Sequence, residues 1–561
     1  MTEERKTNTP ETEAVAESKN FILNFIDEDI AEGGQFQGMT VHTRFPPEPN
    51  GYLHIGHCKA LTIDFGTAEK YNGLCNLRMD DTNPTKEDEE FVEAIKQDIH
   101  WLGFDWGDRF FYGSDYFEKD YEYAVELIKK GLAYVCELTP EQFKEYRGDL
   151  THPAVSPYRD RPIEENLELF NKMNTPEAVE GSMVLRAKLD MANPNMHFRD
   201  PIIYRIILSP HWRTGDKWKV YPMYDFAHPI EDAIEGITHS CCSLEFEDHR
   251  PLYDWVTLNC EFPEPRPRQM EFSRLNINHT IMSKRYLKKL VDTGVVTGWN
   301  DPRMSTLSGM RERGYPAEAI RDFCGRIGVS KSNSQVDITL LEHCVRENLN
   351  LNATRVMVVT DPLKLVVENY PADKTEVIEI ENNPNKPEEG VHTTTFGREL
   401  YIEREDFSLN PPPKYHRLKP DGMVRLKGAY ILKYNRADVD ENGEVTCVYC
   451  DMIEDSKQGG VNAGIKVKGV IHWVNANDSV DVTLNMYDYL LLDGEGDFDT
   501  RINPDSLKVN ASAKAEKFVA EAAPYTRFQF MRKGYFVSVA DFGKDNLKFN
   551  SVVGLKDSYN K

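Results

Sequence analysis

The chain has 561 residues, of which 40% are hydrophobic and 28% are charged. This composition supports several folded domains and excludes disorder along the whole length. The formal net charge of −25 argues against a general coat for nucleic acid, although an acidic body can still carry local basic surfaces.

Cellular location is indicated by the N-terminus, the hydropathy and the cysteines. The first residues, MTEERKTNTPETEAVAESKN, lack the basic and apolar regions of a signal peptide. No apolar run in the sequence approaches the roughly 18 residues that a membrane helix needs. The 10 cysteines are thinly spread, which is typical of reduced thiols. We therefore expect a cytoplasmic protein without a membrane partner.

The N-terminal part of the chain predicts an α/β fold. Residues 1–20 have no apolar periodicity, and we expect a disordered tail there. A strand at 39–45 is followed by the loop PPEPNG, a helix from about residue 55, and a second strand at 75–81. The next helical face is formed by Phe91, Ile95, Ile99 and Leu102. Alternating strands and helices favour a parallel sheet.

The middle of the chain divides into segments of different character. A stretch rich in Pro, Asp and Arg at 114–219 predicts a domain inserted into the α/β fold, whose halves are then 21–113 and 220–285. Residues 286–353 are mainly helical. We therefore expect one α/β fold interrupted by an insertion and followed by helices.

From about residue 354 the chain has a β character. Short strands with turn residues between them predict barrels, and Asn442-Gly443 is a strong hairpin signal. Cys447 and Cys450 form a single CxxC, but zinc would need two more ligands and no partner pair stands near. We expect these cysteines to be strand residues and expect no metal site built by the chain.

The segment RFPPEPNGYLHIGHCKA (44–60) carries the first chemical signal. His54 and His57 stand three residues apart at a predicted helix start, so both rings can face one ligand. The free N–H groups of a helix N-terminus suit phosphate oxygens, and imidazole adds further donors. Gly56 allows a flat base to approach the backbone. Two ordinary helix-start histidines are the alternative for an isolated HxxH.

The segment FSRLNINHTIMSKR (272–285) carries the second signal. It lies in a basic window of the chain, because 264–289 holds seven Lys or Arg residues against two Glu. Lys284 at its tip is suited to bind phosphates and to stabilise a leaving pyrophosphate. The alternative is a solvated charged face. Neither a Walker A motif nor GxGxxG accompanies it, which disfavours P-loop and dinucleotide sites.

Together these segments resemble the HIGH and KMSKS signatures of class I aminoacyl-tRNA synthetases, the second as the variant IMSKR. RFPPEPNGYLHIGH, LRMDDTNP (77–84), YPMYDFAH (221–228) and EGITHSCCSLEF (235–246) resemble the glutaminyl/glutamyl branch. The resemblance covers the chain from about residue 20 to its end. It implies a Rossmann-type catalytic fold in the two α/β halves, with the insertion as an acceptor-stem-binding domain.

The resemblance also implies how the C-terminal half is divided. Residues 286–353 would be a helical connector, and two β-barrels would bind the anticodon. The proximal barrel would comprise 354–411 and 487–561, and the distal barrel 412–486.

The resemblance implies that the amino acid attacks the α-phosphorus of ATP and that tRNA then attacks the aminoacyl-adenylate. Mg²⁺ would accompany the phosphates, and His54, His57 and Lys284 would be catalytic. By motif, the residues that line ATP are Glu48, Pro49, Asn50, His54, Ile55, Gly56, His57, Cys58, Lys59, Ala60, Ser243, Arg274, Leu275, Met282, Ser283 and Lys284.

By the same resemblance, the amino acid is surrounded by Arg44, Asp80, Tyr224, His228, Cys242 and Gln269. Asp80 can pair with the substrate ammonium and Arg44 with its carboxylate. Glutamyl enzymes of the eukaryotic type typically carry Arg where Cys242 stands. A neutral Cys242 offers no charge to a buried carboxylate. We therefore expect L-glutamine as the substrate. The alternative role of Cys242 is packing as a small residue. The alternative role of Asp80 is that of a helix cap or a turn residue.

The resemblance places tRNA(Gln) along the inserted domain, the connector and the barrels. The residues expected to contact it are Leu150, Asp248, Lys331, Arg355, Arg417, Arg425, Lys427, Gln529 and Arg532. We expect a monomer that attaches glutamine to this tRNA with release of AMP and pyrophosphate. The alternatives are a glutamyl enzyme of the eukaryotic or archaeal type and a tRNA-binding protein without catalysis, although intact His54, His57 and Lys284 argue against the latter.

Overall fold

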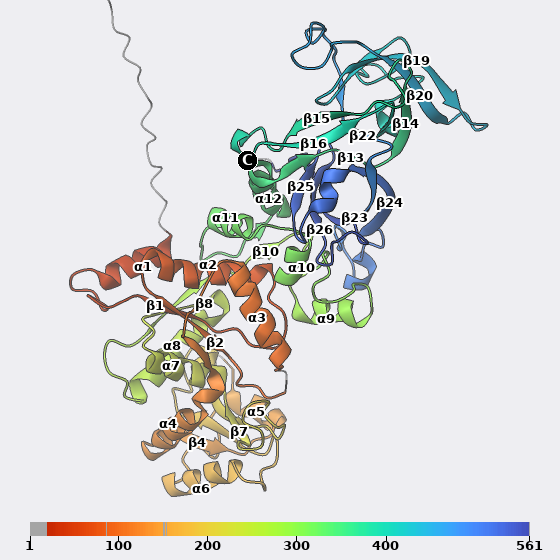
Figure 1. The fold of residues 1–561 in the computed structure, drawn as a ribbon. Coiled ribbons are helices and arrows are strands. Elements are labelled where there is room, and N and C mark those ends of the chain that lie inside the picture. Colours follow the sequence, from red (N-terminus) through yellow and green to blue (C-terminus); the bar gives the residue numbers. More distant parts are fainter. Residues whose placement is uncertain (1–19, 86, 150–151, 153, 560–561) are drawn as a thin grey trace, which may run out of the picture.

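The computed structural model describes residues 20–85, 87–149, 152 and 154–559. The chain is elongated, with the inserted domain at one end and the β-rich C-terminal half at the other (Figure 1). The predicted tail at 1–20 lies outside the described residues except for Asn20, whose side chain caps the first helix. No helix in the described part of the chain is long and apolar enough to cross a membrane.

The part of the chain predicted to be catalytic (21–113 and 220–285), called the catalytic half below, contains two small parallel sheets that meet edge to edge. Strands β1 to β3 form one sheet and β8 and β9 the other, and the amide of Thr238 beside β8 donates to the carbonyl of His42 in β1 at 2.9 Å. This confirms the predicted α/β fold. Its elements are α1 (Phe21–Ile30), β1 (His42–Phe45), α2 (Ile55–Lys70), β2 (Leu74–Met79), α3 (Glu89–Trp101), β3 (Phe110–Tyr112), α7 (Tyr224–Glu235), β8 (His239–Ser243), α8 (Arg250–Asn259) and β9 (Arg268–Phe272).

The insertion is built on a four-stranded antiparallel sheet in the order β4-β5-β6-β7. Its last strand reaches residue 222, beyond the predicted boundary at 219, because β7 pairs with β6. Phe170 from α6 and Phe226 from α7 are fully buried in the same core, which ties the insertion to the catalytic half. The elements are α4 (Phe117–Lys129), β4 (Ala133–Cys136), α5 (Pro140–Arg147), α6 (Ile163–Met173), β5 (Val184–Ala187), β6 (Ile202–Ile206) and β7 (Val220–Pro222).

Helices join the catalytic sheet to the C-terminal half, as predicted for 286–353. Ile320 and Phe323 of α11 and Val345 of α12 lie in one core with Phe65 of α2 and Val537 of the β region. This continuous core connects the catalytic site to the first barrel. The elements of this part are β10 (Asn276–Ile277), α9 (Lys284–Asp292), α10 (Leu307–Glu312), α11 (Ala317–Ile327), β11 (Gln335–Val336) and α12 (Ile338–Asn352).

Two seven-stranded sheets form nearly closed barrels, which confirms the predicted β architecture. The proximal barrel, beside α10 in Figure 1, has the order β12-β25-β26-β27-β23-β24-β13. Its strands are β12 (Thr354–Val356), β13 (Val358–Val359), β23 (Ser479–Tyr487), β24 (Leu507–Glu516), β25 (Arg527–Phe530), β26 (Gly534–Ser538) and β27 (Lys548–Val553).

The distal barrel has the order β21-β18-β19-β20-β14-β17-β22. Its strands are β14 (Pro362–Val367), β17 (Glu399–Glu403), β18 (Met423–Leu426), β19 (Ile431–Val439), β20 (Val445–Met452), β21 (Val470–Ile471) and β22 (Trp473–Asn475), and β15 (Glu376–Glu381) pairs with β16 (Val391–Phe396) separately. This grouping differs from the predicted division at 412 and 486, because β14 pairs with β20 and β23 joins the proximal sheet. Long-range pairing of this kind leaves no local signal.

Two smaller predictions in the distal barrel can be compared with its strands. The Asn442-Gly443 turn joins β19 and β20 as a hairpin, with Gly443 at a φ of +82°. Cys447 and Cys450 are both buried residues of β20, and neither belongs to a cluster of possible metal ligands among the described residues.

Candidate active site

The HIGH segment forms the start of α2, where the two histidines cap the helix. Nδ1 of His54 accepts from the amide of Gly56, and Nδ1 of His57 accepts from the amide of His54, each at 3.1 Å. This leaves Nε2 of each ring as the nitrogen that carries a proton. Burial and the charge of Lys284 lower the pKa of His54 to about 4, and burial with His54 and Lys284 lowers that of His57. Both rings are therefore neutral donors at neutral pH.

Gly56 is required by the close approach of the His54 ring. A Cβ at this position would lie 2.8 Å from Cε1 of His54 and 3.4 Å from the sulfur of Met282. Met282 belongs to the IMSKR segment, so the two signature segments meet here. Lys284 stands at the start of α9, and its Nζ contacts Oδ1 of Asn50 in the Pro-rich loop. The structure thus brings together the two segments that the sequence separates by more than 200 residues.

A cavity of about 560 Å³ opens between these segments and the carboxyl ends of β1 and β8. It combines residues predicted for ATP with residues predicted for the amino acid. From the first set it is lined by His54, Gly56, His57, Lys59, Ala60, Ser243, Arg274, Leu275, Met282 and Ser283, and from the second by Arg44, Tyr224 and Cys242. One cavity therefore receives residues from both predicted sites.

Several predicted ATP residues lie outside the cavity lining. Ile55 and Cys58 are at most 1% exposed and pack in the hydrophobic core, because they occupy the opposite face of α2 from His57. Pro49 is buried, and its carbonyl accepts from Asp88 at 3.2 Å. Lys59 does reach the cavity, where its Nζ donates to the carbonyl of Ser273 at 2.7 Å. The side chains of Ile55 and Cys58 therefore belong to the hydrophobic core and not to the cavity.

Arg44 is fully buried and already has three protein partners. Its Nε donates to Asp232 at 3.1 Å and its Nη1 to the carbonyl of Cys241 at 2.7 Å, while Nη2 contacts His228. Arg78 donates to the same Asp232 oxygen at 2.6 Å. Burial lowers the pKa of His228, so this ring is neutral between the two guanidinium groups. His228 and Arg44 thus belong to one buried network, of which Arg44 reaches the cavity wall.

Asp80 lies in the loop after β2, and burial together with the Glu48 and Asp81 carboxylates raises its pKa to about 6, although Thr82 donates to it at 2.8 Å. A cation that approaches Asp80 would therefore meet a carboxylate that is easily protonated. Asp80 does not line the 560 Å³ cavity, but Tyr224, whose pKa it helps to raise, does.

Cys242, Tyr224 and Gln269 have different surroundings. Burial raises the pKa of the Cys242 thiol, so it stays neutral, and its Sγ lies 3.8 Å from the carbonyl of Met270. The Tyr224 ring stacks on His228 at 4.7 Å. Gln269 lines a separate cavity of about 480 Å³ and donates to the carbonyl of Phe246 at 3.2 Å and to Glu271 at 3.0 Å. The structure therefore brings Cys242 and Tyr224 together without Gln269.

Some residues of the cavity were not predicted from the sequence. They are Phe45, Pro46, Asp64, Cys241, Glu245, Phe246, Phe272 and Asn276. Asp64 follows His57 by seven residues on the same face of α2, a helical spacing that would have indicated it. Its Oδ1 is buried without a hydrogen-bond partner, and burial raises its pKa. Glu245 contacts Arg274 in an ion pair between distant segments, for which no local signal exists.

A second candidate surface is a groove of about 630 Å³ in the distal barrel. Its lining includes Lys414, Arg417, Lys419, Lys466 and Lys468 together with Tyr415, and no acidic residue. A positive groove with an aromatic side chain is typical of a surface that binds an unstacked, single-stranded nucleic acid. Of the residues predicted to contact tRNA, Arg417 lines this groove.

Arg417 and Arg532 share one buried carboxylate at the junction of the two barrels. Asp406 forms an ion pair with Nε of Arg417 at 3.1 Å and accepts from both Nη atoms of Arg532 at 2.6 and 2.7 Å. Arg425 instead holds the loop at 456–463, because its guanidinium donates to the carbonyls of Ser456 and Ala463 at 2.7 and 2.9 Å. The structure therefore leaves Arg425 with a local structural role.

The other residues predicted to contact tRNA are distributed over the molecule. Arg355 and Gln529 stand side by side on β12 and β25, and Arg355 Nε and Gln529 Oε1 are buried without hydrogen-bond partners. Lys331 lies over the rings of Phe21 and Phe25. The remaining predicted positions are Asp248 and Lys427, which are exposed, and Leu150, which lies outside the described residues.

Comparison with known protein families matches nearly the whole chain. Residues 40–351 match the family model "tRNA synthetases class I (E and Q), catalytic domain". Residues 353–453 and 470–538 match two models that are both described as "tRNA synthetases class I (E and Q), anti-codon binding domain". These three matches follow the order of the catalytic half and the two barrels.

Similar proteins include three that are each named "Glutamine--tRNA ligase". The protein from Clostridium perfringens is 54% identical over 97% of this chain and 98% of its own length. The protein from Vibrio cholerae is 52% identical over 98% of this chain and 99% of its own. The protein from Clostridium kluyveri is 51% identical over 97% and 98%. With its signature segments gathered around one cavity, the chain belongs to the class I tRNA synthetases of the E and Q group.

Proposed function

We propose that this protein attaches L-glutamine to tRNA(Gln) through a glutaminyl-adenylate made from ATP. The observation that carries the proposal is the single cavity that joins the HIGH and MSKR segments to Tyr224 and Cys242. The names of relatives that are 54% and 52% identical over nearly their full length support the same reaction. The resemblance to this family supports action as a monomer.

In the proposed reaction the chain positions ATP and stabilises charge. Neutral His54 and His57 offer Nε2–H donors to phosphate oxygens, and Lys284 supplies a positive charge for the leaving pyrophosphate. Mg²⁺ would accompany ATP as part of the substrate. The one His, Asp and Glu cluster with metal-ligand spacing among the described residues is Asp81, Glu87 and His211, and none of its members lines the cavity. The ion would therefore be held by phosphates.

The proposed preference for glutamine depends on the neutral wall near Cys242. The thiol is uncharged, and the charge of Arg44 is balanced by Asp232. A glutamate side chain placed against Cys242 would meet an uncharged thiol, and burying an unpaired carboxylate there is costly. A glutamyl enzyme is therefore less consistent with this site.

The proposed function is tested by offering both amino acids at once. The protein is incubated with ATP, tRNA(Gln), glutamine and glutamate, and the amino acid attached to the tRNA is identified by mass spectrometry. We expect glutamine. Attached glutamate would overturn the substrate assignment, and uncharged tRNA would overturn the proposed enzyme.

Replacing Cys242 by Arg should raise the use of glutamate relative to glutamine. The guanidinium can pair with the γ-carboxylate, whereas the amide of glutamine would meet a group that only donates. We expect the ratio of kcat/KM values to change by about ten- to a hundredfold, or about 1–3 kcal/mol. Cys242→Met is the control for the added volume. If the Arg variant is active but keeps the parent protein's ratio of kcat/KM values for the two amino acids, Cys242 has only a packing role.

Amino-acid affinity should fall at low pH through Asp80. In the proposal its carboxylate pairs with the substrate ammonium, and its pKa is about 6. The attraction is therefore nearly complete from about one pH unit above 6, half lost at about pH 6 and lost as the pH falls further. We expect kcat/KM for glutamine to decline by about tenfold per pH unit below 6. Asp80→Asn should have a lower kcat/KM without this decline, and equal profiles for both proteins would remove Asp80 from the site.

We further propose that tRNA extends from the inserted domain (114–219) past the connector to the barrels, with its anticodon near the distal groove. The basic lining of that groove supports this placement despite the net charge of −25. Arg355 and Gln529, with their unpartnered polar atoms, are proposed to bind anticodon bases at the proximal barrel. The proposed RNA-binding units follow the observed sheets, with β14 and β17 in the distal barrel and β23 in the proximal barrel.

Replacing Arg417 by Ala should weaken tRNA binding by about tenfold, because a phosphate contact is lost from the groove. The slope of log affinity against log salt should also become shallower by about one. Arg436→Ala is the matched control, since Arg436 lies in the same barrel and pairs with Glu368 outside the groove. Filter binding at several salt concentrations measures both the affinity for tRNA and its dependence on salt. Equal affinities for the two variants would remove the groove from the tRNA-binding surface.

A further inference from the structure

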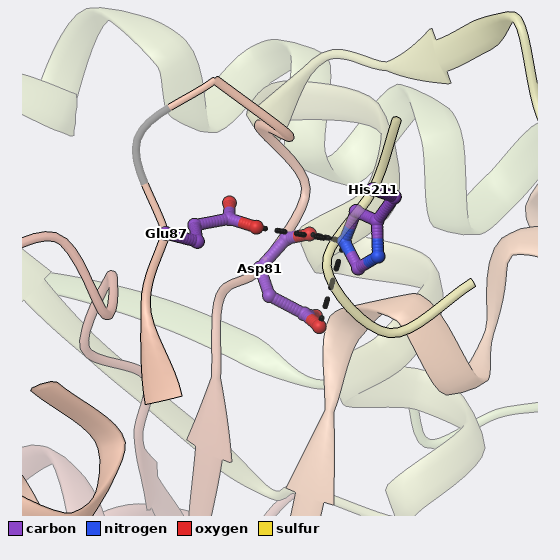
Figure 2. Close-up of side chains that lie close together, drawn as sticks. All are labelled: Asp81, Glu87 and His211. Atoms are coloured by element: carbon purple, nitrogen blue, oxygen red, sulfur yellow. Dashed lines mark hydrogen bonds and ion pairs between the residues drawn. The ribbon is translucent and has the colours of Figure 1, made fainter. Parts of the chain in front are cut away.

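The loop that carries Asp80 is attached to the inserted domain through His211. This histidine lies between β6 and β7, and its side chain is fully buried. Its Nε2 is 2.7 Å from the backbone carbonyl of Asp81, 3.7 Å from the Asp81 carboxylate and 3.5 Å from the Glu87 carboxylate. Figure 2 shows the ring facing both acidic side chains. His211 is therefore at the centre of contacts between two distant segments.

The hydrogen bonds of His211 identify this cluster as a proton-bearing contact and not a metal site. Nδ1 accepts from the amides of Arg213 and Thr214 at 3.1 and 3.2 Å. A neutral ring with Nδ1 as acceptor carries its proton on Nε2, which then donates to the Asp81 carbonyl. A metal would need the lone pair of Nε2. Nε2 of His211 therefore presents an N–H donor at the point where a metal ion would need a nitrogen lone pair.

The same loop is held by further bonds at the residues that follow Asp80. The Asp81 carboxylate accepts from the amide and the hydroxyl of Ser114 at 2.7 and 2.6 Å. Arg213 donates to that hydroxyl at 2.6 Å. Glu87 Oε1 accepts from the amide of Asn83 at 2.7 Å, which closes the loop on itself. Its other oxygen, buried without a hydrogen bond, faces His211.

We propose that His211 is a positioning residue for the amino-acid substrate, acting through Asp80. The Asp80 amide donates to Pro47 at 3.0 Å, so one side of Asp80 is held by the catalytic half. On the other side Asp81 is held by His211 from the inserted domain. The position of the Asp80 carboxylate therefore depends on the position of the inserted domain relative to the catalytic half. This inference rests on the proposed function, in which Asp80 binds the ammonium and the insertion binds the tRNA acceptor stem.

The test compares His211→Ala and His211→Gln with the parent protein at saturating tRNA. We expect His211→Ala to raise KM for glutamine by roughly tenfold, the scale for loss of one buried polar contact. KM for ATP and the Kd for tRNA should change by less than about twofold, because neither ligand contacts Asp80. His211→Gln should recover most of the loss, since its amide places an N–H near the former Nε2.

A double variant distinguishes positioning from a general loss of structure. If His211 acts through Asp80, His211→Ala should have little further effect on KM for glutamine in an Asp80→Asn protein. Tyr134→Phe is the matched control, because it removes a buried hydrogen bond to Asp200 in the same domain without touching the loop. It should leave KM for glutamine unchanged. Additive effects of His211→Ala and Asp80→Asn would overturn the proposal.

Glu87→Gln provides the test if His211→Ala fails to fold, because it keeps the shape of the side chain. It should also raise KM for glutamine, with no further effect in the Asp80→Asn protein. An unchanged KM in Glu87→Gln or in a folded His211→Ala protein would overturn the inference. A parent protein that charges tRNA with neither amino acid would instead overturn the proposed function, so the two failures are distinguishable.

Discussion

The catalytic half depends on one fully buried carboxylate, Asp232, which binds two arginines. Arg44 reaches it from β1 and Arg78 from β2, at 3.1 and 2.6 Å. The hydroxyls of Ser240 and Tyr253 donate to its other oxygen at 2.8 and 2.9 Å. Burial alone would raise its pKa, but Arg44, His228 and Arg78 outweigh burial and hold the pKa well below its usual range. A single side chain of α7 thus joins the strands on which the site is built.

This network also sets the character of the cavity next to it. Because Asp232 balances Arg44, the guanidinium in the cavity wall contributes little net charge there, and the neutral Cys242 thiol beside it adds none. Arg78 is further paired with Glu231 and Glu235 at 2.9 and 3.0 Å. The charges that hold the strands together therefore largely balance one another, including Arg44 in the wall. An amide side chain suits such a wall better than a carboxylate does.

Local patterns in the sequence predicted much of the fold and part of the site. The α2 start, the Asn442-Gly443 hairpin and the β character after residue 354 follow from short-range signals, and all three are present. The grouping of β14 with β20 was missed, because strand pairing across 80 residues has no local signature.

Site residues with a local signal were likewise predicted, and those brought in by the tertiary fold were missed. His57 and Lys284 were found from their motifs, whereas Asp64 needed the direction of the α2 face, and the pairing of Glu245 with Arg274 needed the tertiary fold. Gln269 was assigned to the amino acid by resemblance, but its side chain lines a different cavity. His211 and Asp81 are 130 residues apart, so only the structure brings them together.

The most direct test of this account is the stability of an Asp232→Asn protein. The substitution keeps the shape of the side chain and removes the charge that two buried arginines share. We predict a loss of roughly 3–5 kcal/mol in the free energy of unfolding of the catalytic half, the scale for breaking a buried ion pair. Urea unfolding followed by tryptophan fluorescence measures it, with Asp216→Asn as the control because Asp216 is a largely exposed partner of Lys219. Equal stability of the two variants would contradict the central role of Asp232.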